Sequence, residues 1–204
     1  MAVNLVKGQK VNLVKESPGL RNLRVGLGWD EAEQKRGLFA SLFGGRNADI
    51  DCDASVILCG ADGKVISNTI KECVVYFGNL VHSSGAIRHA GDNLTGSGEG
   101  DDEQITIDVQ RLPANVQKLV FVVNIYEAKT RGQHFGMIRN AFIHITDTQT
   151  NKEICRYNLT DNFSGCTGLI VGELDRNGGQ WEFTAVGRGV VDASYLDKLI
   201  NLYR

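Results

Sequence analysis

The chain has little proline: only 2 of its 204 residues are Pro, against 24 that are Gly. Many short runs rich in Val and Ile separate the glycines. Glycine supplies the backbone freedom that turns need, and β-branched residues favour strands. The composition therefore predicts a chain of strands and turns, and it argues against disorder.

Long apolar runs are also missing. No window approaches the 18 consecutive apolar residues that a membrane-spanning helix needs, and residues 1–8 lack the apolar core of a secretory signal. The sequence thus predicts a cytoplasmic protein with no membrane span.

Paired cysteines and excess positive charge are absent as well. The five cysteines, an odd count, include no C-x-x-C pair, which disfavours a zinc site or a disulfide framework. The formal net charge is -2, so the chain lacks the excess positive charge that is typical of nucleic-acid-binding proteins, and we expect no nucleic-acid partner.

What the sequence does contain is a series of short strand patterns. Residues 23–29 and 104–109 alternate apolar with polar or small residues, and residues 119–126 are almost entirely apolar. Residues 11–14 also resemble a short strand. About ten such strands, with turn signals every 8 to 14 residues, predict an all-β fold, an antiparallel β-sandwich. Short helices complete it, including a C-terminal helix over residues 194–203 that Ser194 can cap.

The most unusual stretch is the acidic loop, which we define as residues 91–103. It holds four glycines and five acidic residues, and no basic residue. Like charges this close together repel, so a folded loop needs a counter-charge. Carboxylates, an amide oxygen, a hydroxyl and free carbonyls form a hard-oxygen ligand set, which suits Ca²⁺ better than zinc or copper. A flexible acidic linker is the alternative interpretation.

A second acidic row precedes the apolar segment 56–58. In a strand, the period of two places Asp49, Asp51, Asp53 and Ser55 on one face. A bound cation would turn this row of like charges into a ligand set. In a sandwich, this row, the strand that ends at Asp30 and the acidic loop can meet at one end of the molecule.

Several motifs stand out along the chain: GLGWD at 26–30, DIDCDAS at 49–55, YFGNL at 76–80, GDNLTGSGEGDDE at 91–103, FGMIRNAF at 135–142, and VGEL followed by WEFTAVG near the C-terminus. They resemble the motifs of the TerD family of tellurium-resistance and stress proteins. They occur in the family's order and cover nearly the whole chain.

This resemblance implies a single β-sandwich domain over residues 1–204 in a cytoplasmic bacterial protein that binds two Ca²⁺ ions. It implies a role in tellurite and general stress resistance as a Ca²⁺-dependent scaffold, sensor or buffer, alongside other stress-resistance proteins, and no enzyme activity. The predicted metal ligands are Asp51, Asp53, Asp92, Asn93, Gly96, Gly98, Gly100, Asp101, Asp102 and Glu103, with Asp30, Asp49 and Asn79 as additional candidates.

Two alternatives stay open. The acidic cluster could hold a catalytic cation in a metal-dependent hydrolase. Docking to a membrane also stays open because Leu38, Phe39, Leu42 and Phe43 interrupt a polar insertion. A Ser-His-Asp arrangement can be drawn because His82 and His89 flank Ser83 and Ser84, with Asp92 near by, but no G-x-S-x-G motif supports it.

Overall fold

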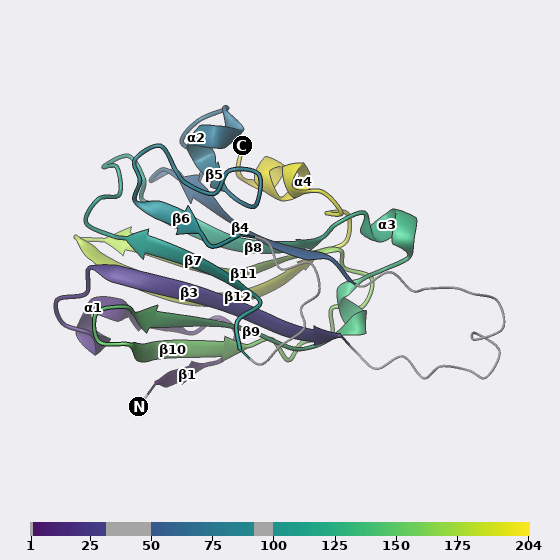
Figure 1. Cartoon of the computed structure of the whole chain (residues 1–204), viewed down its shortest axis with the longest axis horizontal. Helices are drawn as coiled ribbons and strands as arrows, with labels where there is room; N and C mark the ends of the chain where they lie inside the picture. Colours follow the sequence, from purple (N-terminus) through teal and green to yellow (C-terminus); the bar gives the residue numbers. More distant parts are fainter. Residues whose placement is uncertain (1, 32–49, 92–99) are drawn as a thin grey trace.

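The computed structural model of the chain describes residues 2–31, 50–91 and 100–204, and it places their strands in two six-stranded sheets (Figure 1). Sheet 1 has the order β1 (Val3–Leu5), β10 (Lys152–Asn158), β9 (Ile138–Asp147), β3 (Asn22–Glu31), β7 (Glu103–Asp108), β6 (Ile87–His89). Sheet 2 has the order β2 (Lys10–Asn12), β12 (Gln180–Val190), β11 (Gly168–Asn177), β8 (Lys118–Ile125), β4 (Cys52–Cys59), β5 (Val74–Val75). Only the β1–β10 pair is parallel among these strands. The predicted antiparallel sandwich is confirmed.

The helices that the structure describes are short. They are α1 (Leu13–Glu16), α2 (Ile70–Cys73), α3 (Ala128–Arg131) and α4 (Leu196–Ile200), with the 3₁₀ turns Phe135–Met137 and Asn201–Tyr203. None of these helices combines the length and the apolar character that crossing a membrane requires.

The core lies between the two sheets, because alternate residues of each strand face inward. Val25 of β3 and Ile105 of β7 are fully buried from sheet 1, and they share one cluster with Val56 of β4 and Phe121 of β8 from sheet 2. Burial of this apolar surface is the main stabilising term of the fold.

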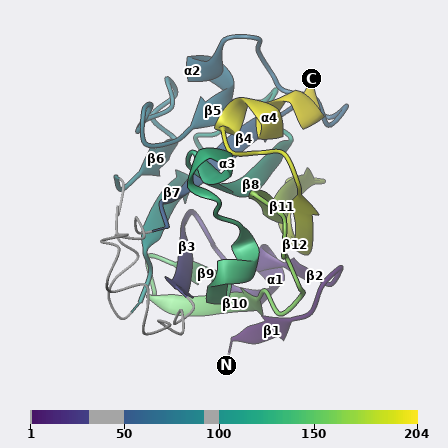
Figure 2. The same cartoon turned by 90° about the vertical axis from the view of Figure 1, so that its right-hand side faces the viewer.

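Sheet 2 is covered on its outer face too. Ile57 of β4, Val122 of β8 and Ile170 of β11 point away from the central core and pack against Leu199 and Ile200 of α4. Figure 2 shows α4 lying against this sheet. This second cover explains why β4 and β8 are buried on both faces.

Two local predictions were wrong in detail. Residues 11–14 do not form one strand: β2 ends at Asn12, whose side chain accepts from the Lys15 amide at 3.0 Å and starts α1. The C-terminal helix forms, but it begins at Leu196 and ends as a 3₁₀ turn. Ser194 does not cap it, because its hydroxyl accepts from the Lys129 amide at 3.3 Å instead.

Candidate metal centre

The ends of three strands meet at one end of the sandwich, as the sequence predicted. The last residues of β3, the first of β4 and the first of β7 all lie toward this end (Figure 1). Side chains that precede or begin β7 contact the backbone of the other two strands. Gly91 and Gly100 have φ of 116° and 118°, values that favour glycine. The backbone therefore adopts a conformation that requires glycine at the first residue of the acidic loop and again three residues before Glu103.

Asp102 ties the acidic loop to β3. Its Oδ2 accepts from the Trp29 amide at 2.7 Å, and its own amide donates to the Leu27 carbonyl at 2.8 Å. Burial raises the pKa of Asp102 above its ordinary value, and the negative charges of Asp30 and Asp101 raise it further, against the lowering effect of the Trp29 N–H. The ionised carboxylate therefore lies in a place that disfavours negative charge, and a cation would relieve that cost.

Glu103 ties the acidic loop to β4. Its Oε2 accepts from the Ala54 amide at 2.6 Å and lies 3.3 Å from Nε2 of His89, which is itself 3.2 Å from the Ala54 carbonyl. Because β5 ends at Val75, opposite Val56, it does not extend to Ala54. The two side chains take the place of a strand there and satisfy both backbone groups of Ala54.

A hydrogen bond from Gly91 decides which ring nitrogen of His89 carries the proton. The Gly91 amide donates to Nδ1 at 3.0 Å, so Nδ1 is an acceptor and Nε2 carries the hydrogen that faces Glu103 and Ala54. His89 and Glu103 are almost fully buried. They hold the two ends of the acidic loop against sheet 2.

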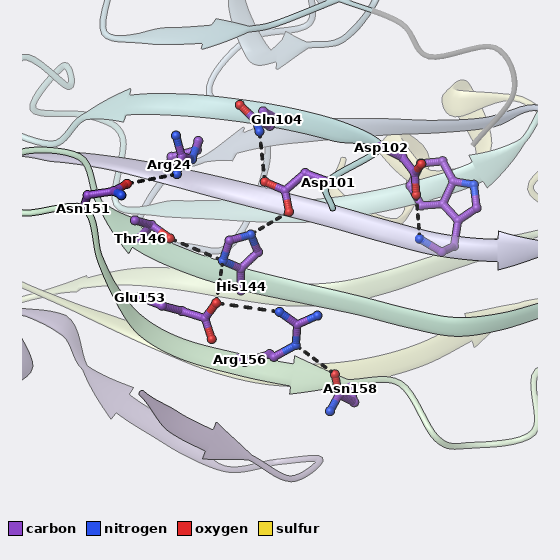
Figure 3. Close-up of polar contacts among 11 residues, drawn as sticks. Arg24, Asp101, Asp102, Gln104, His144, Thr146, Asn151, Glu153, Arg156 and Asn158 are labelled. Carbon is purple, nitrogen blue, oxygen red and sulfur yellow. Dashed lines mark hydrogen bonds and ion pairs between the residues drawn. The ribbon is translucent and has the colours of Figure 1, made fainter. Parts of the chain in front are cut away.

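Asp101 points to the outer face of sheet 1 (Figure 3). Its Oδ1 lies 2.7 Å from Nε2 of His144 on β9, and its Oδ2 accepts from the Gln104 side chain at 3.0 Å. The other ring nitrogen of His144 lies 3.2 Å from Glu153. Both carboxylate oxygens of Asp101 are thus engaged by protein groups.

Asp53 lies on the other face of β4 from Ala54. It is 5% exposed and accepts from the side-chain amide of Asn124, its cross-strand neighbour on β8, at 3.3 Å. The Oδ1 of Asn124 and the hydroxyl of Ser55 are buried and have no hydrogen-bond partner among the described residues. Asn124 was not among the predicted ligands, although it is the only polar residue within the apolar run 119–125. That interruption was the signal available.

The other predicted ligands are more dispersed. Asp51 lies 3.9 Å from Arg131, and Asp30 accepts from the Asn140 side chain at 2.7 Å. The side-chain amide of Asn79 donates to the Val74 carbonyl at 2.7 Å and braces the turn after β5. Gly100 precedes Asp101. Asp49, Asp92, Asn93, Gly96 and Gly98 lie outside the described residues. Within the described ranges alone, no three His, Cys, Asp or Glu side chains are arranged to hold a metal ion.

The Ser-His-Asp alternative gains no support from His82. Its Nδ1 lies 2.7 Å from the Ser84 hydroxyl, but its Nε2 faces the backbone carbonyl of Glu72 at 3.1 Å. The Ser84 hydroxyl also accepts from the Ala86 amide, so the pair braces a turn. Asp92 lies outside the described residues.

The family model for the TerD domain matches residues 1–203. The chain belongs to the TerD family. It is 49% identical over 203 residues to stress response protein SCP2 of Bacillus subtilis (strain 168), and the match covers 100% of each chain. It is 48% identical over 185 residues to tellurium resistance protein TerZ of Serratia marcescens, covering 91% of this chain and 89% of TerZ.

A solved structure shares the TerD fold. It is that of a homologue of telluride resistance protein from Streptomyces coelicolor A3(2), with a TM-score of 0.58 and 24% identity, covering 84% of this chain and 90% of that one. The resemblance that the sequence motifs indicated is confirmed.

Proposed function

We propose that this TerD-family protein binds Ca²⁺ at the end of the sandwich where β3, β4 and β7 meet, and that it acts in tellurite and general stress resistance as a Ca²⁺-dependent scaffold, sensor or buffer. The observation that carries the proposal is Asp102. Burial raises the pKa of its carboxylate, the charges of Asp30 and Asp101 raise it further, and the Trp29 amide holds Oδ2 in place.

The donor chemistry fits a hard cation. Asp53, Asp102 and Glu103 supply carboxylates, and the amide oxygen of Asn124 and the Ser55 hydroxyl supply neutral oxygens. The two histidines at this end, His89 and His144, already use both ring nitrogens in contacts with protein atoms. Oxygen ligands without imidazole suit Ca²⁺ better than zinc or copper.

In this proposal Asp51, Asp53, Asp102 and Glu103 do not share one ion by themselves. They contribute to the shells of two ions, and the predicted ligands of the segment 92–99 supply the remaining contacts. The bound Ca²⁺ supplies positive charge that offsets the repulsion among these carboxylates. The protein's own residues orient the ligands: Trp29 and Ala54 fix one oxygen each of Asp102 and Glu103 through backbone amides.

The biological role rests on the relatives. TerZ of Serratia marcescens is named a tellurium resistance protein, and SCP2 of Bacillus subtilis a stress response protein. We extend both roles to this chain, with a cytoplasmic location and with other stress-resistance proteins as its partners. None of these names specifies a reaction, in keeping with a binding protein.

The test is isothermal titration calorimetry of the metal-free protein with Ca²⁺ and, separately, with Mg²⁺. We expect Ca²⁺ to bind more tightly, because a glycine-rich loop adapts to Ca²⁺ whereas Mg²⁺ demands a tight octahedron. The variant Asp102→Asn should weaken Ca²⁺ binding, and Asp62→Asn, in a remote turn, should not. Equal affinities for the two ions, or equal effects of the two substitutions, would show that bulk charge attracts the ion.

A further inference from the structure

Two glycines of β3 provide space on the outer face of sheet 1. Gly26 and Gly28 alternate with Val25, Leu27 and Trp29, which are buried in the core. Neither glycine has a positive φ, so backbone conformation does not require glycine at either position. Glycine weakens a strand interior, and its presence there often marks a close approach by another group.

The approaching group is the end of the acidic loop. A β-carbon at Gly26 would lie 2.2 Å from Nε2 of His144 and 2.3 Å from Oδ2 of Asp101, and one at Gly28 would lie 2.8 Å from the Gly100 carbonyl. These distances are too short for any side chain. The two glycines therefore form a seat in which Gly100 and Asp101 lie across β3.

Asp101 is held in this seat from both sides (Figure 3). Gln104 of β7 donates to one oxygen and His144 of β9 contacts the other. An ionised carboxylate only accepts, so Nε2 of His144 carries the hydrogen that it donates. The side chains of Asp101 and His144 are each only 10% exposed, and low exposure strengthens such a charge-assisted contact.

The support of His144 extends further from the loop. Glu153 of β10 contacts its second nitrogen, and Arg156 lies 3.7 Å from Glu153. The guanidinium of Arg156 stacks over Phe142 at 3.8 Å from the ring centroid. Phe142 is the side chain that a β-carbon at Gly28 would strike, at 2.4 Å. The seat, the histidine and its support thus form one packed unit on sheet 1.

We infer that Asp101 is a positioning residue of the acidic loop rather than a ligand of the ion. Held in the seat of Gly26 and Gly28 by His144 and Gln104, it sets the register in which Asp102 meets Trp29 and Glu103 meets Ala54. The consecutive carboxylates of Asp101, Asp102 and Glu103 are each fixed to a different strand. Loss of the first contact therefore makes the positions of the other two carboxylates less well defined. The inference deepens the Ca²⁺ site proposed above and, as far as metal binding is concerned, rests on it.

The decisive experiment starts with the full-length, metal-free protein. Amide hydrogen exchange by NMR is measured for Trp29 and Asp102, whose amides donate to Asp102 and Leu27. Gly26→Ala should abolish their protection. The control is Gly172→Ala, which forces a β-carbon to 2.4 Å from Phe183 in β12 and lowers stability elsewhere. It should leave the protection of both amides in place. Unchanged protection in Gly26→Ala would overturn the inference, whether or not the protein binds Ca²⁺.

Calorimetry with Ca²⁺ then separates positioning from ligation. Asp101→Ala should weaken Ca²⁺ binding by about 10-fold, the usual lower effect of losing a group that orients a ligand. Asp101→Asn keeps a carbonyl that can accept from His144, so it should restore most of the affinity and the full stoichiometry. Loss of a bound ion in Asp101→Asn, with Trp29 and Asp102 still protected, would make Asp101 a ligand. If the parent protein binds no Ca²⁺, the proposed function fails and the exchange result still decides the role of Asp101.

Discussion

The Trp29 amide donates to Asp102 over 2.7 Å, and this one bond joins the end of β3 to the residue that precedes β7. Burial raises the pKa of the carboxylate that accepts it, and the charges of two other acidic side chains, Asp30 and Asp101, raise it further. The bond thus holds a negative charge where the metal-free protein disfavours one. Two predictions about stability follow from the charge on this group and on its neighbours.

The first prediction concerns pH and Asp102 in the metal-free protein. Because the folded-state pKa of Asp102 is raised, the folded state binds its proton more tightly than the unfolded state does. Its contribution to stability is therefore most favourable at low pH and is lost as pH rises from the unfolded pKa through the raised folded pKa. At pH 7 with chelator, Asp102→Asn should melt at a higher temperature than the parent protein, since the Asn side chain still accepts from Trp29.

With saturating Ca²⁺ the order should reverse, because the parent then gains the ion's binding energy and the variant loses part of it. Differential scanning calorimetry at pH 5 and pH 7, with and without Ca²⁺, measures both effects. An Asp102→Asn variant that melts below the parent under every condition would contradict the prediction.

The second prediction concerns Glu103, which replaces a missing strand beside β4. Glu103→Ala removes the acceptor 2.6 Å from the buried Ala54 amide and should cost about 1–3 kcal/mol, the penalty for an unsatisfied buried group. Glu103→Gln keeps an acceptor and should cost less. Urea unfolding in excess chelator measures the difference without any contribution from metal. Equal losses in the two variants would show that the charge, rather than the hydrogen bond, matters.

Sequence patterns predict the strands well where they alternate. The alternation over residues 104–109 predicted a strand with one apolar face, and Ile105 and Ile107 on that face are both buried in the central core. Of the row expected on one face of a strand, Asp53 and Ser55 lie in β4, because a period of two is a local property, whereas Asp51 precedes β4 and Asp49 lies outside the described residues. The meeting of β3, β4 and the acidic loop at one end followed from the sandwich architecture.

The contacts of the loop could not be predicted in the same way. The role of His89 depends on β5 ending at Val75, and the space over Gly26 depends on which strands flank β3. Both are results of sheet order, and sequence periodicity does not specify sheet order. Asn124 visibly interrupts an apolar run in the sequence, but its position opposite Asp53 follows only from the register of β8 on β4.

The third prediction concerns Asn124. Its side-chain NH₂ donates to Asp53, and its buried oxygen has no partner in the part of the chain that the structure describes. Asn124→Ala should weaken Ca²⁺ binding by about 10–100-fold, as expected when a group that orients a metal-binding carboxylate is lost. Calorimetry measures this, with Asn115→Ala in a remote turn as the control. Unchanged affinity would place Asp53 and Asn124 outside the site.

The fourth prediction links the ion to the stability of the whole domain. Asp102 is partly buried and lies within the influence of the charges of Asp30 and Asp101, and the repulsion among these carboxylates opposes folding when no metal is present. An ion that binds only the folded state stabilises it by RT ln(1 + [L]/Kd), about 2.7 kcal/mol at a hundredfold excess over Kd. For a domain of this size that corresponds to about 5–11 °C in melting temperature, at ~2–4 °C per kcal/mol.

Chelation should therefore lower the melting temperature by several degrees and loosen the amides of Ala54 and Asp102 first. The strands β8 and β11 should keep their hydrogen exchange protection, because Phe121, Val122 and Ile170 are packed in the two apolar clusters. Melts with saturating Ca²⁺ and with excess chelator, at one ionic strength, measure the effect, and Mg²⁺ at the same concentration controls for charge screening. Superimposable curves would show that the folded protein does not bind Ca²⁺, because stabilisation by a ligand that prefers the folded state is a thermodynamic necessity.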